Sequence, residues 1–296
     1  NVGAFLDEVS LSKIKNFKGK ALVLNSVNTQ NPDTLSIFHE LRIGLSMICP
    51  IVWINNSKFT WSVSREVAEF PVLEMSDSLI WDADSIYMNI ENVFLGDIIT
   101  HNVIGKVSGA KKKSIIVSAH YDHLGMMGEA IFPGANDNAS GVAMLLNLAN
   151  YFSDKSPKYN LVFMAFGAEE AGILGSKYYV ENPLFPLQDI KFVLNLDIMG
   201  TGDEGITVVN GTQHKKQFKL LSDINKKHKY LTKIKIRGRA ANSDHYWFSQ
   251  LGIPSFFIYT MGGIKAYHDI YDRAETLPMS EFNDLYHLLI EFLSEI

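Results

Sequence analysis

Two side chains that bind metal ions well stand near the two ends of the segment covering residues 114–143. His120 directly follows the apolar run SIIVSA, and Asp137 lies in the turn PGANDNASG, ahead of an apolar stretch that reads as a helix. In open α/β sheets, sites form outside the carboxyl ends of the strands, which suits both positions. Imidazole and carboxylate groups without thiolate are ligands for zinc or a similar divalent ion. The segment therefore predicts one part of a metal site.

Asp122 is a candidate for supporting this site. It lies two positions after His120 in an extended segment, so both side chains are expected on the same side. Its carboxylate can accept the second imidazole N–H and fix the tautomer of the ring. Ordinary interpretations exist as well: a histidine after a strand is usually a satisfied polar residue, and Asp137 ahead of a helix can be an N-cap. The metal interpretation therefore depends on ligands elsewhere.

Three later segments deliver side chains of the same kinds. Glu169 and Glu170 follow the apolar run NLVFMAF, Asp197 ends the run VLNLD, and His268 stands in a loop after two glycines. Neighbouring glutamates point in different directions, so one can bind a metal ion while the other faces a reacting water. Alternatively, both glutamates simply favour the first turn of a helix. Asp272 lies close enough beyond His268 to support it.

The ligand candidates are too many for one zinc ion. Two imidazoles and three carboxylates exceed a single tetrahedral site that keeps one position open. Two ions fit better, because paired ions about 3.5–4 Å apart share a bridging carboxylate and a water. The candidates are His120, Asp137, Glu170, Asp197 and His268, with Glu169 as a spare carboxylate.

We expect two domains: a small α/β module over residues 1–84 and the domain that carries the site over residues 85–296. In the module the sequence predicts strands and a helix, at 19–24, 33–46 (the helix), 48–54 and 70–75. The module contains few side chains suited to catalysis. It is either a stabilising appendage or a lid that narrows access to the site, and both interpretations stay open.

The domain that carries the site alternates strands with helices. Strands are expected at 98–107, 114–119, 160–166, 190–196 and 253–259, and helices from Gly141 onward and around 175–180. This alternation predicts a largely parallel sheet with helices on both faces. The strand at 98–107 is expected to form an antiparallel ribbon with the central strand, with Lys111 to Lys113 in the turn, which makes the sheet mixed.

Composition excludes several classes of protein. The 296 residues carry a formal net charge of −5, and no basic patch interleaved with aromatic residues indicates nucleic-acid binding. No apolar stretch approaches the ~20 residues of a membrane span. The single cysteine, Cys49, lies in an apolar segment and excludes an intrachain disulfide and a cysteine-based zinc cluster. The chain starts at Asn1 rather than Met, which fits removal of an export signal. Nothing in the sequence indicates an oligomeric state.

Five segments together carry a family resemblance. In order, AHYDHLG, PGANDNASG, FGAEEAGILGS, NLDIMG and YHDIYD resemble the motifs of the zinc-dependent exopeptidases of peptidase family M28, over about the C-terminal two-thirds of the chain. The resemblance implies a phosphorylase/hydrolase-like α/β sandwich and two Zn²⁺ ions per chain. It assigns one ion to His120 and Asp197, the other to Glu170 and His268, and the bridge to Asp137. FKGKALVL and FPVLEM in the module resemble the protease-associated insert of such peptidases.

The resemblance also implies an activity. It predicts an aminopeptidase that releases N-terminal residues from peptides, with a water activated by two zinc ions and Glu169 as general acid and base. Asp122 is expected to support the site, with Asp272 and the Ser243–Asp244–His245 cluster as further candidates. Export to the periplasm or the cell exterior is expected from the same resemblance.

Alternatives from the same fold remain. A carboxypeptidase or dipeptidase would bind a substrate carboxylate, for which Arg237 and Arg239 are candidates. Glutaminyl cyclases work with a single zinc ion and would not need all five ligands. Receptor-like relatives that lack ligands serve as interaction scaffolds, but every ligand is present here.

Overall fold

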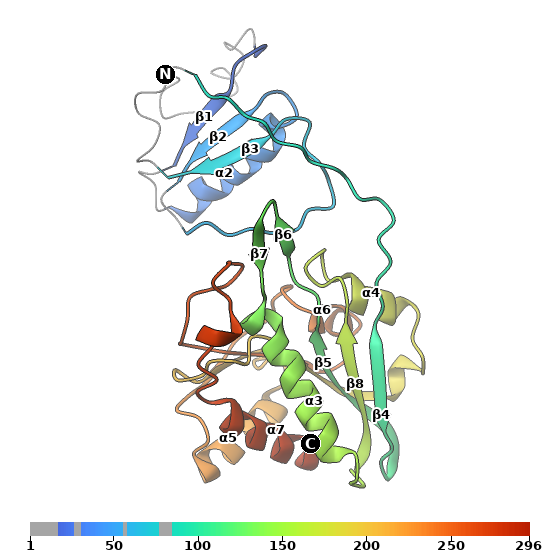
Figure 1. The fold of residues 1–296 in the computed structure, drawn as a ribbon. Coiled ribbons are helices and arrows are strands. Elements are labelled where there is room, and N and C mark those ends of the chain that lie inside the picture. Colours follow the sequence, from blue (N-terminus) through green and yellow to red (C-terminus); the bar gives the residue numbers. More distant parts are fainter. Residues whose placement is uncertain (1–16, 27–30, 56–57, 77–84) are drawn as a thin grey trace. The chain divides into compact units, whose positions relative to one another are not determined.

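The structure is a computed structural model that describes residues 17–26, 31–55, 58–76 and 85–296 (Figure 1). The described residues form two compact units. One lies within residues 1–59 and 64–97, and the other comprises 60–63 and 98–296. The domain boundary predicted after residue 84 lies outside the described residues. Within the described residues, no helix combines the length and apolar character that crossing a membrane requires.

The first unit is a small α/β fold with a parallel sheet in the order β1-β2-β3. Its elements are β1 (Leu22–Asn25), α2 (Pro32–Leu45), β2 (Ile51–Ile54) and β3 (Val72–Met75). The central strand β2 is buried along its whole length, as its run of apolar residues predicts. Cys49 and Trp53 pack in the same core with Leu24. The three strands and the helix predicted for this region are confirmed, with shorter strands.

The second unit is built on a seven-stranded sheet in the order β11-β10-β12-β9-β5-β8-β4. Four central strands run parallel: β5 (Lys111–His120), β8 (Tyr159–Phe166), β9 (Ile190–Leu196) and β12 (Ser255–Thr260). The edges carry β4 (Val103–Val107), antiparallel to β8, and β10 (Ile206–Val209), antiparallel to β12, followed by β11 (Ile234–Ile236). The predicted mixed, largely parallel sheet is confirmed.

Helices cover both faces of this sheet, as predicted (Figure 1). Alternate residues of β5 explain why: Ile115 and Val117 pack in one apolar core, and Ile116 packs in the other. The first core includes residues of α3 (Gly141–Phe152), α5 (Lys215–His228) and α7 (Phe282–Glu295). The second includes residues of α4 (Leu174–Glu181) and α6 (His245–Gln250).

Short elements fill the connections of the second unit. They are the hairpin β6 (Gly125–Met127) and β7 (Ala130–Phe132), and the single turns η2 (Ala135–Ser140), η3 (Leu187–Asp189) and η4 (Ala274–Thr276). The hairpin and η2 connect the end of β5 to α3, so they lie on the path between His120 and the helix predicted from Gly141. That helix is confirmed.

Two predictions about the start of this unit are wrong. The strand predicted at 98–107 is shorter, and β4 pairs with β8 rather than with the central strand β5. Residues Lys111 to Lys113 belong to β5 itself instead of forming a turn. The reason is that β5 has a parallel neighbour on each side, which leaves the antiparallel strand a place only beyond β8. The lysines lie at the exposed start of β5, where charge costs little.

Candidate metal centre

The sheet brings the predicted ligands to one edge. His120 is the last residue of β5, Asp197 directly follows β9, and Glu170 follows β8 by a short loop. Because these strands are parallel, their carboxyl ends meet at the same edge. His268 enters from the loop after β12, and Asp137 from the turn η2. All five side chains converge there, and four of them are buried.

Asp137 lies between the two histidines. Its Oδ1 is 3.4 Å from Nε2 of His120, and its Oδ2 is 3.5 Å from Nε2 of His268. Beyond His120, Oδ2 of Asp197 lies 3.5 Å from the same Nε2. Beyond His268, Oε2 of Glu170 lies 3.3 Å from its Nε2. The five side chains thus form two groups that share one carboxylate.

The spacing of these atoms suits bound zinc. Ligand bonds of about 2.0–2.1 Å arranged tetrahedrally place neighbouring ligand atoms about 3.3–3.4 Å apart. The separations of 3.3 to 3.5 Å across Asp137, His120 and His268 match that value, and they are longer than ordinary hydrogen bonds. Oδ1 of Asp197 is also buried without a hydrogen-bond partner among the described residues. The donor set therefore fits two zinc ions.

Without metal ions, these groups stabilise one another's charges. Although burial lowers it, contacts with Asp137 and Glu170 raise the pKa of His268 to about 10. The pKa of His120 is likewise raised, against burial, chiefly by Asp197. Hydrogen bonds from both histidines outweigh burial at Asp137 and lower its pKa. Zinc would take the place of the two imidazole protons.

Glu169 lies beside this cluster. Its carboxylate has an oxygen within 4.8 Å of a ring nitrogen of His120 and of a carboxylate oxygen of Glu170. Burial, reinforced by Asp244 and Asp197, raises the pKa of Glu169 to about 9. Added positive charge in the cluster would lower this value toward neutrality. Glu169 is therefore more basic than an ordinary carboxylate and well placed to move a proton.

Asp122 supports the site by contacts that differ from the predicted one. Nδ1 of His120 lies 3.1 Å from the backbone carbonyl oxygen of Asp122, and 3.8 Å from its carboxylate. The carboxylate instead accepts the backbone N–H groups of Glu169 and Glu170, each at 3.0 Å. Asp122 thus orients His120 through its main chain and fixes the glutamate loop through its side chain.

Asp272 holds the turn that carries Asp137 rather than supporting His268. Its two carboxylate oxygens accept the backbone N–H groups of Asn136 and Asp137, at 2.8 and 3.0 Å. His268 is oriented by a different group: its Nδ1 lies 2.9 Å from the backbone carbonyl oxygen of Trp61, in the segment 60–63. Donation from Nδ1 to this carbonyl leaves Nε2 of His268 free to bind a metal ion.

A chain of buried polar side chains runs beneath Asp197. Ser118 donates to Asn195 at 2.7 Å, Asn195 donates to Ser243 at 2.7 Å, and Ser243 donates to Oδ2 of Asp197 at 3.1 Å. Asp244 is fully buried next to this chain, and burial raises its pKa to about 7. Of the cluster predicted around Ser243, this serine therefore has a direct contact with a ligand candidate.

The backbone at the site is strained. His268 has φ of 51°, Ile198 after Asp197 has φ of 56°, and Ala168 before Glu169 has φ of 57°. Non-glycine residues rarely adopt this left-handed conformation, which costs on the order of 1–3 kcal/mol at each position. Such strain gathers where the surrounding structure holds functional groups in place, and here it flanks three of the converging segments.

His123 is a site residue that the sequence reasoning missed. Its Nδ1 lies 3.0 Å from Oε1 of Glu170, and its side chain is 10% exposed. Atoms of His123, Asp137 and Glu170 lie within 4.8 Å of one another. A signal was present, because His123 stands in the same AHYDHLG motif as His120, three residues further on.

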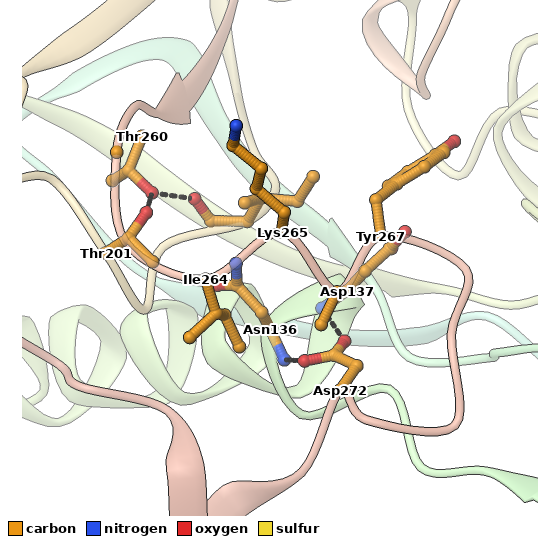
Figure 2. A pocket seen from close by; sticks show the side chains of 11 residues that line it. Asn136, Asp137, Thr201, Thr260, Ile264, Lys265, Tyr267 and Asp272 are labelled. Carbon is orange, nitrogen blue, oxygen red and sulfur yellow. Dashed lines mark hydrogen bonds between the residues drawn. The ribbon is translucent and has the colours of Figure 1, made fainter. Parts of the chain in front are cut away.

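A small cavity of about 140 Å³ opens beside Asp137 (Figure 2). Its walls include Ile198, Ile264 and Tyr267, of which the first and last are sequence neighbours of Asp197 and His268. Thr201 and Thr260 also line it, with their hydroxyl oxygens 2.6 Å apart, and Thr260 donates to the carbonyl of Ile198. The cavity therefore adjoins the candidate ligands and has mixed apolar and hydroxyl walls.

Several curated proteins are similar in sequence. A probable zinc metalloprotease of Pyrenophora teres f. teres is 26% identical over 209 residues, which cover 68% of this chain and 40% of that protein. The aminopeptidase YwaD of Bacillus subtilis is 38% identical over 109 residues, covering 36% of this chain and 23% of that protein. The chain thus spans well under half of the length of these relatives.

Solved structures share the fold. The zinc aminopeptidase BSAP of Bacillus subtilis aligns with a TM-score of 0.66 and 20% identity, over 94% of this chain and 70% of that one. A leucine aminopeptidase precursor of Bacteroides thetaiotaomicron aligns with a TM-score of 0.57 and 22% identity, over 66% of this chain and 76% of that one. The family model of peptidase family M28 matches residues 102–293, which include every converging ligand candidate. The chain belongs to peptidase family M28.

Proposed function

We propose that this chain is an aminopeptidase that works with two zinc ions. The observation that carries the proposal is the position of Asp137 between His120 and His268, with 3.4 and 3.5 Å separations on its two sides. In this proposal His120 and Asp197 hold one ion, Glu170 and His268 hold the other, and Asp137 bridges them. Relatives named as zinc metalloprotease and aminopeptidase support the assignment.

The proposed reaction is hydrolysis of the first peptide bond. When bound, the zinc ions polarise the scissile carbonyl and the attacking water. Glu169 accepts a proton from that water and returns it to the nitrogen of the departing amine. Asp122 holds the backbone of Glu169 and Glu170 through two hydrogen bonds. The proton acceptor Glu169 and the ligand Glu170 therefore keep fixed positions relative to each other.

The charges around the site favour a substrate with a free amine. Carboxylates gather in and around it: Asp122, Asp137, Glu169, Glu170, Asp197, Asp244 and Asp272. Even with two divalent ions bound, the site keeps a net negative charge, because the carboxylates outnumber the positive charges of the ions. This net charge attracts an ammonium group and repels a carboxylate. Arg237, a candidate for carboxylate binding, instead donates to the hydroxyl of Tyr259 at 3.2 Å and does not line the cavity beside Asp137. Carboxypeptidase activity is therefore less well supported.

We assign the side chain of the cleaved residue to the cavity beside Asp137. A volume of about 140 Å³ accommodates an aliphatic side chain better than an indole ring. The apolar walls from Ile198 and Ile264 suit such a side chain, since burying it removes apolar surface from water. We expect aliphatic aminoacyl amides to be better substrates than the tryptophan derivative.

The test is hydrolysis of a panel of aminoacyl chromogenic amides and of their N-acetylated counterparts. We expect cleavage of the free amines alone, loss of activity on chelation, and recovery with zinc. The acetylated panel is the matched control, because it differs only in the charge and size of the amine. Cleavage of both panels, or of neither by zinc-loaded protein, would contradict the aminopeptidase assignment.

Metal content separates the remaining alternatives. Two zinc ions per active chain agree with the proposal, one agrees with a cyclase-like centre, and none with an interaction scaffold. We include export from the cytoplasm in the proposal, on the strength of the family resemblance alone. Fractionation of the source cells tests it, and retention in the cytoplasm would contradict it.

A further inference from the structure

His123 is held firmly beside the candidate metal centre without belonging to the predicted ligand set. It lies between the end of β5 and the hairpin β6–β7. Gly134 packs directly against its ring: a Cβ at this glycine would come within 2.5 Å of Cγ of His123. The His123 and His268 rings are 6.0 Å apart and nearly perpendicular. The ring therefore has little freedom to turn away from Glu170.

The carboxylate of Glu170 is divided between two histidines. Oε2 faces Nε2 of His268 at 3.3 Å, whereas Oε1 faces Nδ1 of His123 at 3.0 Å. The second distance is that of a hydrogen bond and shorter than the separations across the ligand cluster. A carboxylate only accepts, so Nδ1 of His123 carries the hydrogen. Nε2 of His123 is buried and has no hydrogen-bond partner among the described residues.

We propose, building on the zinc site proposed above, that His123 is a positioning residue for Glu170. It donates its Nδ1 hydrogen to Oε1 and so presents Oε2 alone to the second ion. Without this donor, the Glu170 carboxylate can rotate and present either oxygen to the ion. The ion then loses a preoriented ligand. Partners of this kind change metal affinity by about 10–100-fold.

The test compares zinc affinities of the full chain and three variants. His123→Ala removes the donor, and His123→Asn restores an N–H near the position of Nδ1. His228→Ala is the matched control. His228 also pairs with a glutamate, since its Nε2 lies 3.1 Å from Oε2 of Glu291, but it is not part of the site. Stepwise dissociation constants for zinc are measured by competition with a chromophoric chelator. The absorption spectrum of the Co²⁺-substituted proteins reports the ligand set.

We expect His123→Ala to weaken the binding of one ion by about 10–100-fold. His123→Asn should bind within about threefold of the wild type, with an unchanged Co²⁺ spectrum, and His228→Ala should bind as the wild type. Wild-type affinities in His123→Ala would overturn the inference. Equal losses in the alanine and asparagine variants would overturn it too, since the imidazole would then be a direct ligand.

Failure of the positioning role of His123 can be distinguished from failure of the proposed function. Wild-type chain that binds fewer than two zinc ions, or cleaves no aminoacyl amide, contradicts the proposed function whatever the variants do. Wild-type chain that binds two ions and cleaves the amides, together with unaltered affinities in His123→Ala, contradicts only the positioning role.

Discussion

Glu169 is the residue on which the proposed proton transfer depends. Replacing it as Glu169→Gln keeps its size and removes the basic oxygen, while the ligands His120, Asp137 and His268 are unchanged. We expect kcat to fall by about 10²–10⁴-fold, the usual contribution of such a group. Zinc content should stay at the wild-type value, measured by elemental analysis of the same preparation. Turnover close to that of the wild type would exclude the role.

His245 links the stability of the chain to pH. It is fully buried in α6, and burial lowers its pKa to about 4 from an ordinary value of 6.5. Between these two values the unfolded chain binds a proton that the folded chain does not, so the free energy of unfolding falls as the pH falls. The shift corresponds to about 3 kcal/mol. Above pH 6.5 His245 is neutral in both the folded and the unfolded chain, so none of this stability is lost.

The variant His245→Gln tests this linkage. Urea unfolding of metal-free protein at pH 7 and pH 4.5 gives the loss of stability for each chain. The variant should lose less than the wild type over this window, because its side chain takes up no proton. The carboxylates titrate in both chains and cancel in the comparison, so equal losses would show that His245 does not contribute.

The candidate ligands could be predicted from sequence, because each is a metal-binding side chain that follows a strand or a glycine-rich turn. Their supporting contacts could not. His120 and His268 are oriented by the backbone carbonyls of Asp122 and Trp61, and any residue type supplies a carbonyl. His123 was missed for another reason: in an extended segment it is expected to point away from the side shared by His120 and Asp122, whereas its Nδ1 lies 3.0 Å from Oε1 of Glu170.

At the scale of elements, the turn η2 depends on Asp272. This carboxylate accepts two backbone N–H groups of the turn that carries Asp137. In Asp272→Asn the amide nitrogen would face one of them, leaving a buried donor unsatisfied at a cost of about 1–3 kcal/mol. We expect a lower free energy of unfolding and weaker zinc binding, measured by urea unfolding and chelator competition.

Asp154→Asn is the control for this experiment. Asp154 lies outside the turn, and its exposed carboxylate pairs with Lys155 at 3.1 Å. It should leave stability and zinc affinity nearly unchanged. If Asp272→Asn behaves in the same way, the turn is held by its other contacts, such as the bond from Gly200 to Asn136.

In the second unit, the strands with long apolar runs could be predicted, and the short strands β10 and β11 could not. The patterns at 160–166 and 190–196 correspond to β8 and β9 almost residue for residue. The strands β10 and β11, by contrast, have four and three residues, too few to show a period. The partner of β4 was also mispredicted. Its true partner, β8, is distant in the chain, and no sequence pattern near either strand indicates the pairing.

At the scale of the whole molecule, zinc should stabilise one unit and not the other. The candidate ligands all belong to the unit that includes residues 98–296. Ligand present at about 1,000 times its dissociation constant adds about 4 kcal/mol to the stability of the state that binds it. Hydrogen exchange read by mass spectrometry should therefore slow in β5 and β9 on addition of zinc and stay the same in β2. Equal slowing in both units would contradict this expectation.

The strand order has a consequence for how the chain acquires its centre. In the sheet β12 lies between β9 and β10, although both precede it in the sequence. During synthesis on the ribosome, β9 can pair with β5 and β10 with β11, but these pairs join into one sheet only when β12 arrives, and His268 follows β12. Refolding monitored with a zinc indicator should thus show capture of the second ion no earlier than insertion of this strand. The full set of candidate ligands can therefore come together only after the strand that joins the two parts of the sheet has been made.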